Sequence, residues 1–188
     1  MPLPSFLAGC VIAVAGTLLS AASPIVAAPA PAGGVEIVMR NVNHTAGNCQ
    51  AALPAFETNL RKRPLGLVNE GDATLFVTCA FTSGGYYGHN PQNATSAEIW
   101  IRNGATTART ISCTGVAGGG YGEGAPAYIT RSRHFEAGSG QAPITWYASD
   151  FPGAPSVFPS GLFSISCQVP TDAVLVSTFV IYRAYANF

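Results

Sequence analysis

Apolar and polar side chains alternate along several stretches of this chain. The alternation is clearest in residues 75–81, 98–102, 110–114 and 163–169. Because successive side chains of a β-strand point to opposite faces, a period of two predicts half-buried antiparallel strands. Further strand candidates, rich in apolar and β-branched residues, are 35–42, 65–69, 128–135, 144–149 and 174–182.

Turn-forming residues separate these stretches. They occur at residues 69–72, 103–104, 118–120 and 138–140, where Asn and Gly favour tight or left-handed backbone. About nine short strands at such spacing are typical of a sandwich or closed barrel. We therefore predict an all-β fold, a single antiparallel β-sandwich that is jelly-roll-like or immunoglobulin-like. The one helical candidate, residues 51–61, contains Pro54 and predicts at most a short turn.

The cysteines predict two disulfides within this sandwich. Leaving aside Cys10 in the N-terminal apolar run, the chain has Cys49, Cys79, Cys113 and Cys167. An even number in an exported chain indicates disulfides, whereas the absence of a CxxC pair argues against zinc. Four cysteines allow three pairings. We favour Cys49–Cys79 and Cys113–Cys167. Cys113 and Cys167 lie in strand-like segments of similar pattern, which could be neighbours in the sandwich. Cys49 lies in a polar segment that could close onto the strand of Cys79.

The N-terminal residues suggest export. An apolar run covers residues 7–19 and small residues follow it. This pattern is typical of a secretory signal peptide, and the run is short for a membrane span, which needs about 20 apolar residues. We expect a signal peptide and Ala/Pro-rich leader over residues 1–32, cleaved between residues 22 and 32, and one domain over residues 33–188. Cys10 completes a lipobox-like Leu-Ala-Gly-Cys, but the apolar run continues past it, so we expect a secreted or periplasmic protein without a lipid anchor.

The charge balance excludes some partners. Nine basic and nine acidic residues give a formal net charge of zero. A chain without a strong field is not drawn to nucleic acid or to an anionic membrane surface. The one basic run, Arg61-Lys62-Arg63, is most simply a solvated turn. We therefore expect neither nucleic acid nor a membrane span in the mature chain.

Short motifs around the cysteines resemble a known group of proteins. They are Asn48-Cys49-Gln50, Gly66-Leu67-Val68-Asn69, Val77-Thr78-Cys79, Ile111-Ser112-Cys113 and Ser166-Cys167-Gln168-Val169-Pro170. Their order resembles small secreted bacterial proteins of uncharacterised function, over residues 41–182. The resemblance implies a single β-sandwich with its cysteines at strand ends, and an exported location. It implies no catalytic residue.

Catalytic chemistry has little support in the residues. No G-x-S-x-G nucleophile elbow is present, and His44, His89 and His134 show no spacing typical of a metal site. Glycoside hydrolysis needs two carboxylates, for which Glu98 and Asp150 are the candidates beside tryptophans. A cross-strand ion pair is the simpler explanation of Glu98. We predict no enzyme activity, no metal and no cofactor.

Aromatic residues give the best indication of a binding surface. Trp100 falls on the polar face of its strand, and Tyr86, Tyr87 and Tyr121 lie in Gly-rich segments. Exposed aromatic rings beside polar groups stack on sugar rings or anchor protein partners, although core packing is the alternative for Trp100. Trp146 alternates with Tyr147, so one of the two must face outward, and we include Trp146 among the binding candidates.

These observations favour a non-enzymatic secreted or envelope-associated protein with a binding or structural role. A glycan or an extracellular protein is the class of partner that the aromatic candidates suit. Two alternatives remain: an enzyme acting on carbohydrate or cell-wall polymer, and a subunit of a secreted fibre. In the last, the apolar C-terminal run, residues 173–186, would complete a neighbour's sheet as an edge strand.

Overall fold

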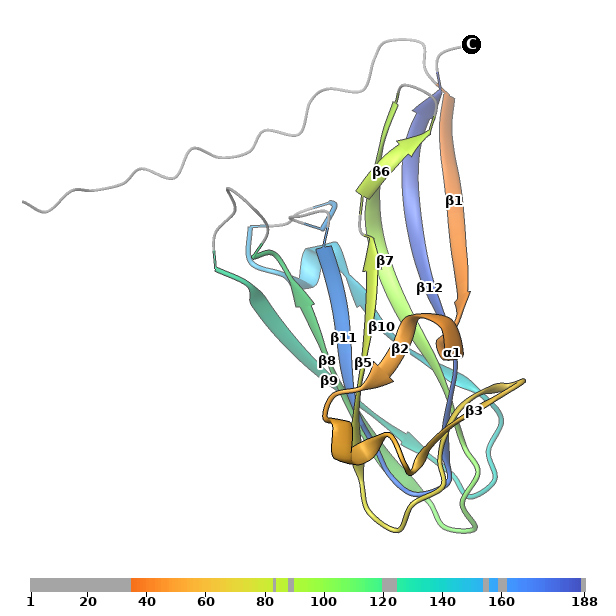
Figure 1. Ribbon diagram of the computed structural model, residues 1–188. Coiled ribbons are helices and arrows are strands. Elements are labelled where there is room, and N and C mark those ends of the chain that lie inside the picture. The colour runs from red at the N-terminus through yellow and green to blue at the C-terminus, as the bar shows by residue number, and fades with distance from the viewer. Residues whose placement is uncertain are drawn as a thin grey trace, which may run out of the picture.

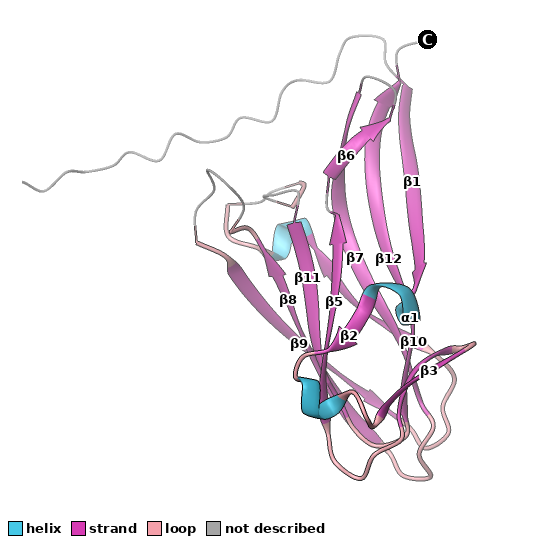
Figure 2. Ribbon diagram, viewed as in Figure 1, coloured by secondary structure: helices cyan, strands magenta, loops and turns pink. Residues whose placement is uncertain are grey.

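A computed structural model describes residues 35–82, 84–87, 90–119, 125–153, 156–158 and 162–186. Most of this part of the chain lies in two antiparallel sheets (Figure 1). The helices are three short turns: α1 (Thr45–Asn48), η1 (Pro54–Phe56) and η2 (Ala148–Asp150) (Figure 2). The predicted all-β sandwich is therefore confirmed, and the only helix within residues 51–61 is the short turn η1. The predicted signal peptide and leader, with Cys10, lie outside the described residues.

The seven-stranded sheet has the order β10-β7-β12-β4-β3, with β1 also paired to β12 and β6 to β7. Its strands are β1 (Val35–His44), β3 (Leu60–Arg63), β4 (Gly66–Asn69), β6 (Gly84–Tyr87), β7 (Asn90–Asn103), β10 (Ala142–Tyr147) and β12 (Ala173–Ala186). The five-stranded sheet has the order β2-β5-β11-β8-β9. Its strands are β2 (Cys49–Ala51), β5 (Leu75–Thr82), β8 (Arg109–Ala117), β9 (Ala127–Phe135) and β11 (Leu162–Val169). Every predicted strand segment forms a strand, and β2, β3 and β6 are additional short ones.

The core lies between the two sheets and follows the period-two pattern. Strand β8 shows it directly, because residues 111, 113, 115 and 117 are buried while residues 112, 114 and 116 between them are partly exposed. An aromatic cluster fills one end of the core, where the rings of Phe158 and Phe163 stack 4.5 Å apart. Each fully buried large apolar side chain contributes about 1.5–3 kcal/mol to the free energy of unfolding. The inward-facing residues are thus the main source of stability.

Both predicted disulfides are present. Cys49 pairs with Cys79 and Cys113 with Cys167. Each joins residues directly opposite each other on neighbouring strands of the five-stranded sheet, β2 to β5 and β8 to β11. The bridges therefore connect strands within one sheet and do not join the two sheets to each other.

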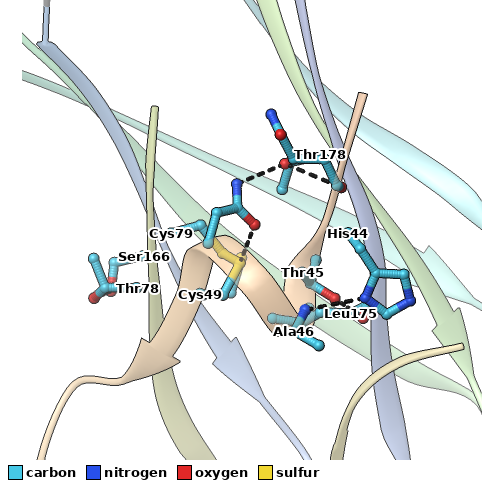
Figure 3. Close-up of a disulfide and its surroundings, with 12 residues drawn as sticks. His44, Thr45, Ala46, Cys49, Thr78, Cys79, Ser166, Leu175 and Thr178 are labelled. Atoms are coloured by element: carbon cyan, nitrogen blue, oxygen red, sulfur yellow. Dashed lines mark hydrogen bonds between the residues drawn. A yellow bond between two sulfur atoms is a disulfide. The ribbon is translucent and has the colours of Figure 1, made fainter. Parts of the chain in front are cut away.

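The helix α1 carries the chain from β1 in one sheet to β2 in the other. The Thr45 hydroxyl donates to the carbonyl of Leu175, and the Asn48 amide donates to the Thr178 hydroxyl at 2.9 Å (Figure 3). Both acceptors lie on β12. Side-chain hydrogen bonds thus fix this crossing next to the Cys49–Cys79 bridge.

Two buried asparagines fix two further crossings between the sheets, from β4 to β5 and from β7 to β8. Asn69 and Asn103 each end a strand of the seven-stranded sheet and are fully buried. Each side chain accepts a hydrogen bond from the backbone N–H two residues later and donates to the carbonyl four residues later. This is the Asx-turn chemistry expected of such residues, and the turns predicted from the sequence at these positions are confirmed.

The C-terminal strand is central in its sheet, which corrects one prediction. Strand β12 pairs with β7 along one side, and with β1 and β4 along the other. An edge strand must have one side free to complete a neighbouring sheet. Residues 173–186 therefore do not form the exposed edge expected in the fibre-subunit alternative. No helix in the described ranges is both long enough and apolar enough to cross a membrane.

Burial of Tyr182 on β12 predicts a loss of stability at high pH. Desolvation raises the pKa of its phenol above the ordinary value of 10.0, and a side-chain hydrogen bond with Asn41 opposes part of the rise. A raised folded-state pKa means that the stabilisation is complete below about pH 10 and is lost as pH rises through the folded pKa. Urea unfolding at about pH 8 and about pH 11 should show a larger decrease in stability for the native chain than for Tyr182→Phe. Equal decreases would contradict this assignment.

Candidate functional site

The face of the seven-stranded sheet turned away from the core carries a compact group of aromatic and charged side chains. Trp100 on β7 lies 5.7 Å from the ring of Phe179 on β12. The Trp100 indole N–H donates to Glu98 at 2.9 Å, and Arg40 on β1 lies 3.8 Å from the same carboxylate. Arg40 also stacks over the Phe179 ring, 4.6 Å from its centroid. The indole N–H, the carboxylate and the guanidinium of this cluster are thus paired with one another.

Tyr147 is the most exposed aromatic residue of this face among the described side chains. It ends β10 and is 54% exposed, whereas the preceding Trp146 is 0% exposed. Its backbone N–H donates to the Asp150 carboxylate at 2.6 Å. Asp150 in turn pairs with Arg131 on β9, at 2.6 Å. The two sheets thus hold the Tyr147 backbone jointly while its ring projects into solvent.

Two hollows share Tyr147 as part of their lining. The first, which we call the sheet hollow, has a volume of about 500 Å³. It is lined by Val38, Thr95, Ser96, Tyr147, Ala148, Ser149, Ser156, Ile181 and Arg183. The second, the seam hollow, has a volume of about 450 Å³ and is lined by Arg131, Ser132, Arg133, Pro143, Ile144, Thr145 and Tyr147. Both volumes fall in the range of about 300–1,000 Å³ that is usual for small-molecule sites.

The seam hollow lies where the two sheets meet along an edge. Strands β9 and β10 are the edge strands of their respective sheets, and side-chain contacts join them. The Trp146 indole donates to the carbonyl of Ile129 at 2.8 Å, and Arg133 donates to the carbonyl of Pro143 at 2.8 Å. The Arg131–Asp150 pair completes this seam. Ordered contacts on both sides therefore support the hollow.

The structure separates the predicted binding residues. Trp100 lies on the outward face, as predicted, half-buried against Phe179. Trp146 shares the inward face of β10 with Ile144 and is buried in the core. Its prediction as a binding residue was therefore wrong. Tyr86 and Tyr87 lie in β6, but their side chains, like all of Tyr121, are outside the described part.

Tyr147, Arg131 and Arg133 were not among the binding residues predicted from the sequence. The period of β10 contained a usable signal, because Ile144 and Trp146 share one face and Tyr147 takes the other. Arg131 and Arg133 gave no local signal. Their position opposite Tyr147 depends on how β9 and β10 meet.

The two carboxylates considered for hydrolysis have separate roles. Glu98 contacts Arg40 and Trp100 on the outer face, and Asp150 contacts Arg131 at the seam. Each is thus engaged by its own arginine. Within the described ranges, no three His, Cys, Asp or Glu side chains are grouped closely enough to hold a metal ion.

The histidines have local contacts. The His44 ring lies 2.8 Å from the carbonyl of Pro64 and accepts from the N–H of Ala46 (Figure 3). His134 lies beside Glu136 on the exposed face of β9. His89 is outside the described residues.

Comparison with known proteins finds distant structural similarity alone. No protein-family model matches the chain, and no curated protein matches it in sequence. Solved structures with some similarity include TmCBM61 in complex with β-1,4-galactotriose, at 9% identity and a TM-score of 0.36, covering 78% of this chain and 86% of that one. The CBM36-1 domain of a multidomain xylanase from the hindgut metagenome of Trinervitermes trinervoides has 12% identity and a TM-score of 0.33, covering 80% of this chain and 98% of that one. A CBM4 structure has 9% identity and a TM-score of 0.30, covering 78% and 86%. Such low identities and scores assign no ligand to this chain.

Proposed function

We propose that this protein is a non-enzymatic carbohydrate-binding protein whose ligand lies across Tyr147 and the two hollows beside it. The observation that carries the proposal is the exposed Tyr147 ring, which lines both hollows while contacts from both sheets hold its backbone. A rigidly held aromatic ring binds the apolar face of a sugar without losing much side-chain entropy.

The lining of the hollows also suits a polyhydroxylated ligand. In the sheet hollow, Thr95, Ser96, Ser149 and Ser156 are short hydroxyl side chains. Thr145 and Ser132 provide hydroxyls in the seam hollow. Hydroxyl groups both donate and accept hydrogen bonds, which matches the alternating donors and acceptors of a sugar. Several hydroxyl side chains beside one aromatic ring therefore favour a sugar over a wholly apolar ligand.

The location forms part of the same proposal. Two disulfides are typical of proteins that fold in oxidising compartments. We infer that the chain is exported and acts outside the cytoplasm, as the small secreted bacterial proteins that it resembles are expected to do. Binding of an extracellular polysaccharide is compatible with that location.

Replacing Tyr147 tests the proposal. We expect at least one soluble polysaccharide from a panel of neutral and acidic polymers to bind in isothermal titration calorimetry. Tyr147→Ala should weaken that binding by about tenfold or more, since truncating a central aromatic contact costs at least about 1.4 kcal/mol.

Tyr128→Ala is the matched control. Tyr128 is a tyrosine of similar exposure, 63%, on the outer face of the other sheet. Its replacement should leave the affinity unchanged. If no polysaccharide binds, or if both variants weaken binding equally, the proposed site is wrong.

A further inference from the structure

The arginines that line the two hollows are not equivalent. Arg183 in the sheet hollow lies 3.3 Å from the Glu36 carboxylate, and Arg131 in the seam hollow lies 2.6 Å from Asp150. Each of these positive charges is therefore compensated by a neighbouring negative one. Neither hollow has an Asp or Glu among its lining residues in the described part of the chain.

Arg133 is the exception. No carboxylate of the described residues lies within ion-pair distance of its guanidinium. One of its N–H groups donates to the carbonyl of Pro143 at 2.8 Å, and the guanidinium stands over the Phe135 ring at 5.8 Å. A guanidinium has five N–H donors, so this contact holds it in place and leaves donors for a ligand. Arg133 is thus an ordered positive charge that the protein itself does not neutralise.

The position of Arg133 relative to Tyr147 defines the ligand that would suit both. The two side chains come from β9 and β10, on either side of the seam, and both line the seam hollow. A sugar ring against Tyr147 would present a substituent toward Arg133. An arginine binds an oxyanion through two parallel hydrogen bonds, which a neutral hydroxyl cannot match in strength.

We infer that the seam hollow selects an acidic polysaccharide, with a sugar ring on Tyr147 and its carboxylate or sulfate group on Arg133. This inference rests on the proposed carbohydrate-binding function and adds the charge class of the ligand. The formal net charge of the chain is zero, so the selectivity would come from Arg133, the one arginine in the two hollows without an ion pair among the described residues. It would not come from a general attraction between the protein and polyanions.

Titration calorimetry with three polymers tests the inference. Oligomers of polygalacturonate carry carboxylates, sulfated dextran carries sulfate esters, and unmodified dextran is neutral. At least one acidic polymer should bind about tenfold or more tightly than dextran, and the stronger of the two acidic polymers identifies the anion. Arg133→Gln should reduce its affinity by about tenfold or more, in line with the loss of a hydrogen bond to a charged group.

Two further variants separate a specific contact from a general change in charge. Arg61→Gln removes the same charge from β3, at the opposite edge of the seven-stranded sheet from β10, and should change the affinity less than twofold. Arg133→Lys keeps the charge but not the planar pair of donors, and should recover only part of the affinity. Circular dichroism melting of each variant shows whether the seam remains folded.

The outcomes distinguish this inference from the proposed function. If Tyr147→Ala abolishes binding but acidic and neutral polymers bind equally well, the protein binds carbohydrate and the acidic selectivity is wrong. Equal effects of Arg133→Gln and Arg61→Gln would also overturn the selectivity. If an acidic peptide, poly-glutamate, binds as tightly as the polysaccharides and is insensitive to Tyr147→Ala, the site recognises charge alone, and both proposals fail.

Discussion

Replacing Trp146 with alanine should lower the free energy of unfolding by about 3–5 kcal/mol, as is typical for truncating a large buried aromatic side chain. Trp146 is fully buried, and its ring lies edge-on to Phe163 with centroids 6.5 Å apart. The ring also packs against Gly115, where an added Cβ would lie 2.8 Å from it. So close a fit leaves a cavity when the indole is removed. Urea unfolding followed by far-ultraviolet circular dichroism measures the effect without depending on tryptophan fluorescence.

Tyr147→Ala is the control for this prediction. The two residues are adjacent on β10 but face opposite sides of the sheet. Replacing the exposed tyrosine should therefore change the free energy of unfolding by less than about 1 kcal/mol. Trp146→Phe should give an intermediate loss, because it keeps a ring but removes the hydrogen bond to the Ile129 carbonyl. Similar losses for Trp146→Ala and Tyr147→Ala would contradict the assignment of these two residues to a buried and an exposed face of β10.

Removing the Cys113–Cys167 bridge by a double alanine substitution is the second change with a large expected effect. The bridge closes a loop with a sequence separation of 54 residues. On the chain-entropy model, such a cross-link stabilises the fold by about 4 kcal/mol, because it restricts the unfolded chain. The same loss is therefore expected in the free energy of unfolding, measured by urea denaturation under non-reducing conditions.

The Cys49–Cys79 bridge provides the comparison. Its sequence separation is 30 residues, for which the same model gives a slightly smaller contribution of about 3.5 kcal/mol. Both bridges lie in the five-stranded sheet and both are buried, so the two double variants differ mainly in loop length and in the strands that are joined. A loss below about 1 kcal/mol for Cys113→Ala/Cys167→Ala would indicate that the unfolded chain stays compact without the bridge.

The site could be predicted only in part. The alternation of apolar and polar residues within β7 correctly predicted that Trp100 lies on the outward face, because a period of two is a property of a single strand. The same rule applied to β10 would have selected Tyr147 over Trp146, since Ile144 and Trp146 share the inward face. Trp146 was predicted as a binding residue because it is a tryptophan, whereas its position in the alternation of β10 determines that it faces the core.

Strand pairing was harder to foresee than the strands themselves. The apolar run at the C-terminus predicted a strand, and β12 forms there. That it is the centre of the seven-stranded sheet depends on β1, β4 and β7, which are far from it in the sequence. An apolar strand is suited equally to the centre of a sheet and to an edge that a partner covers, so composition does not separate the two.

The sequence by itself determined that the chain forms a β-sandwich and where most of its strands lie, and it favoured the cysteine pairing that the structure has. Alternation of side chains and turn chemistry are local properties, and three of the four bridged cysteines lie in strands that the local pattern predicted. The tertiary structure alone decided that Tyr147, Arg131 and Arg133 meet at one seam. They come from the edges of different sheets, and only the packing of the two sheets brings those edges together.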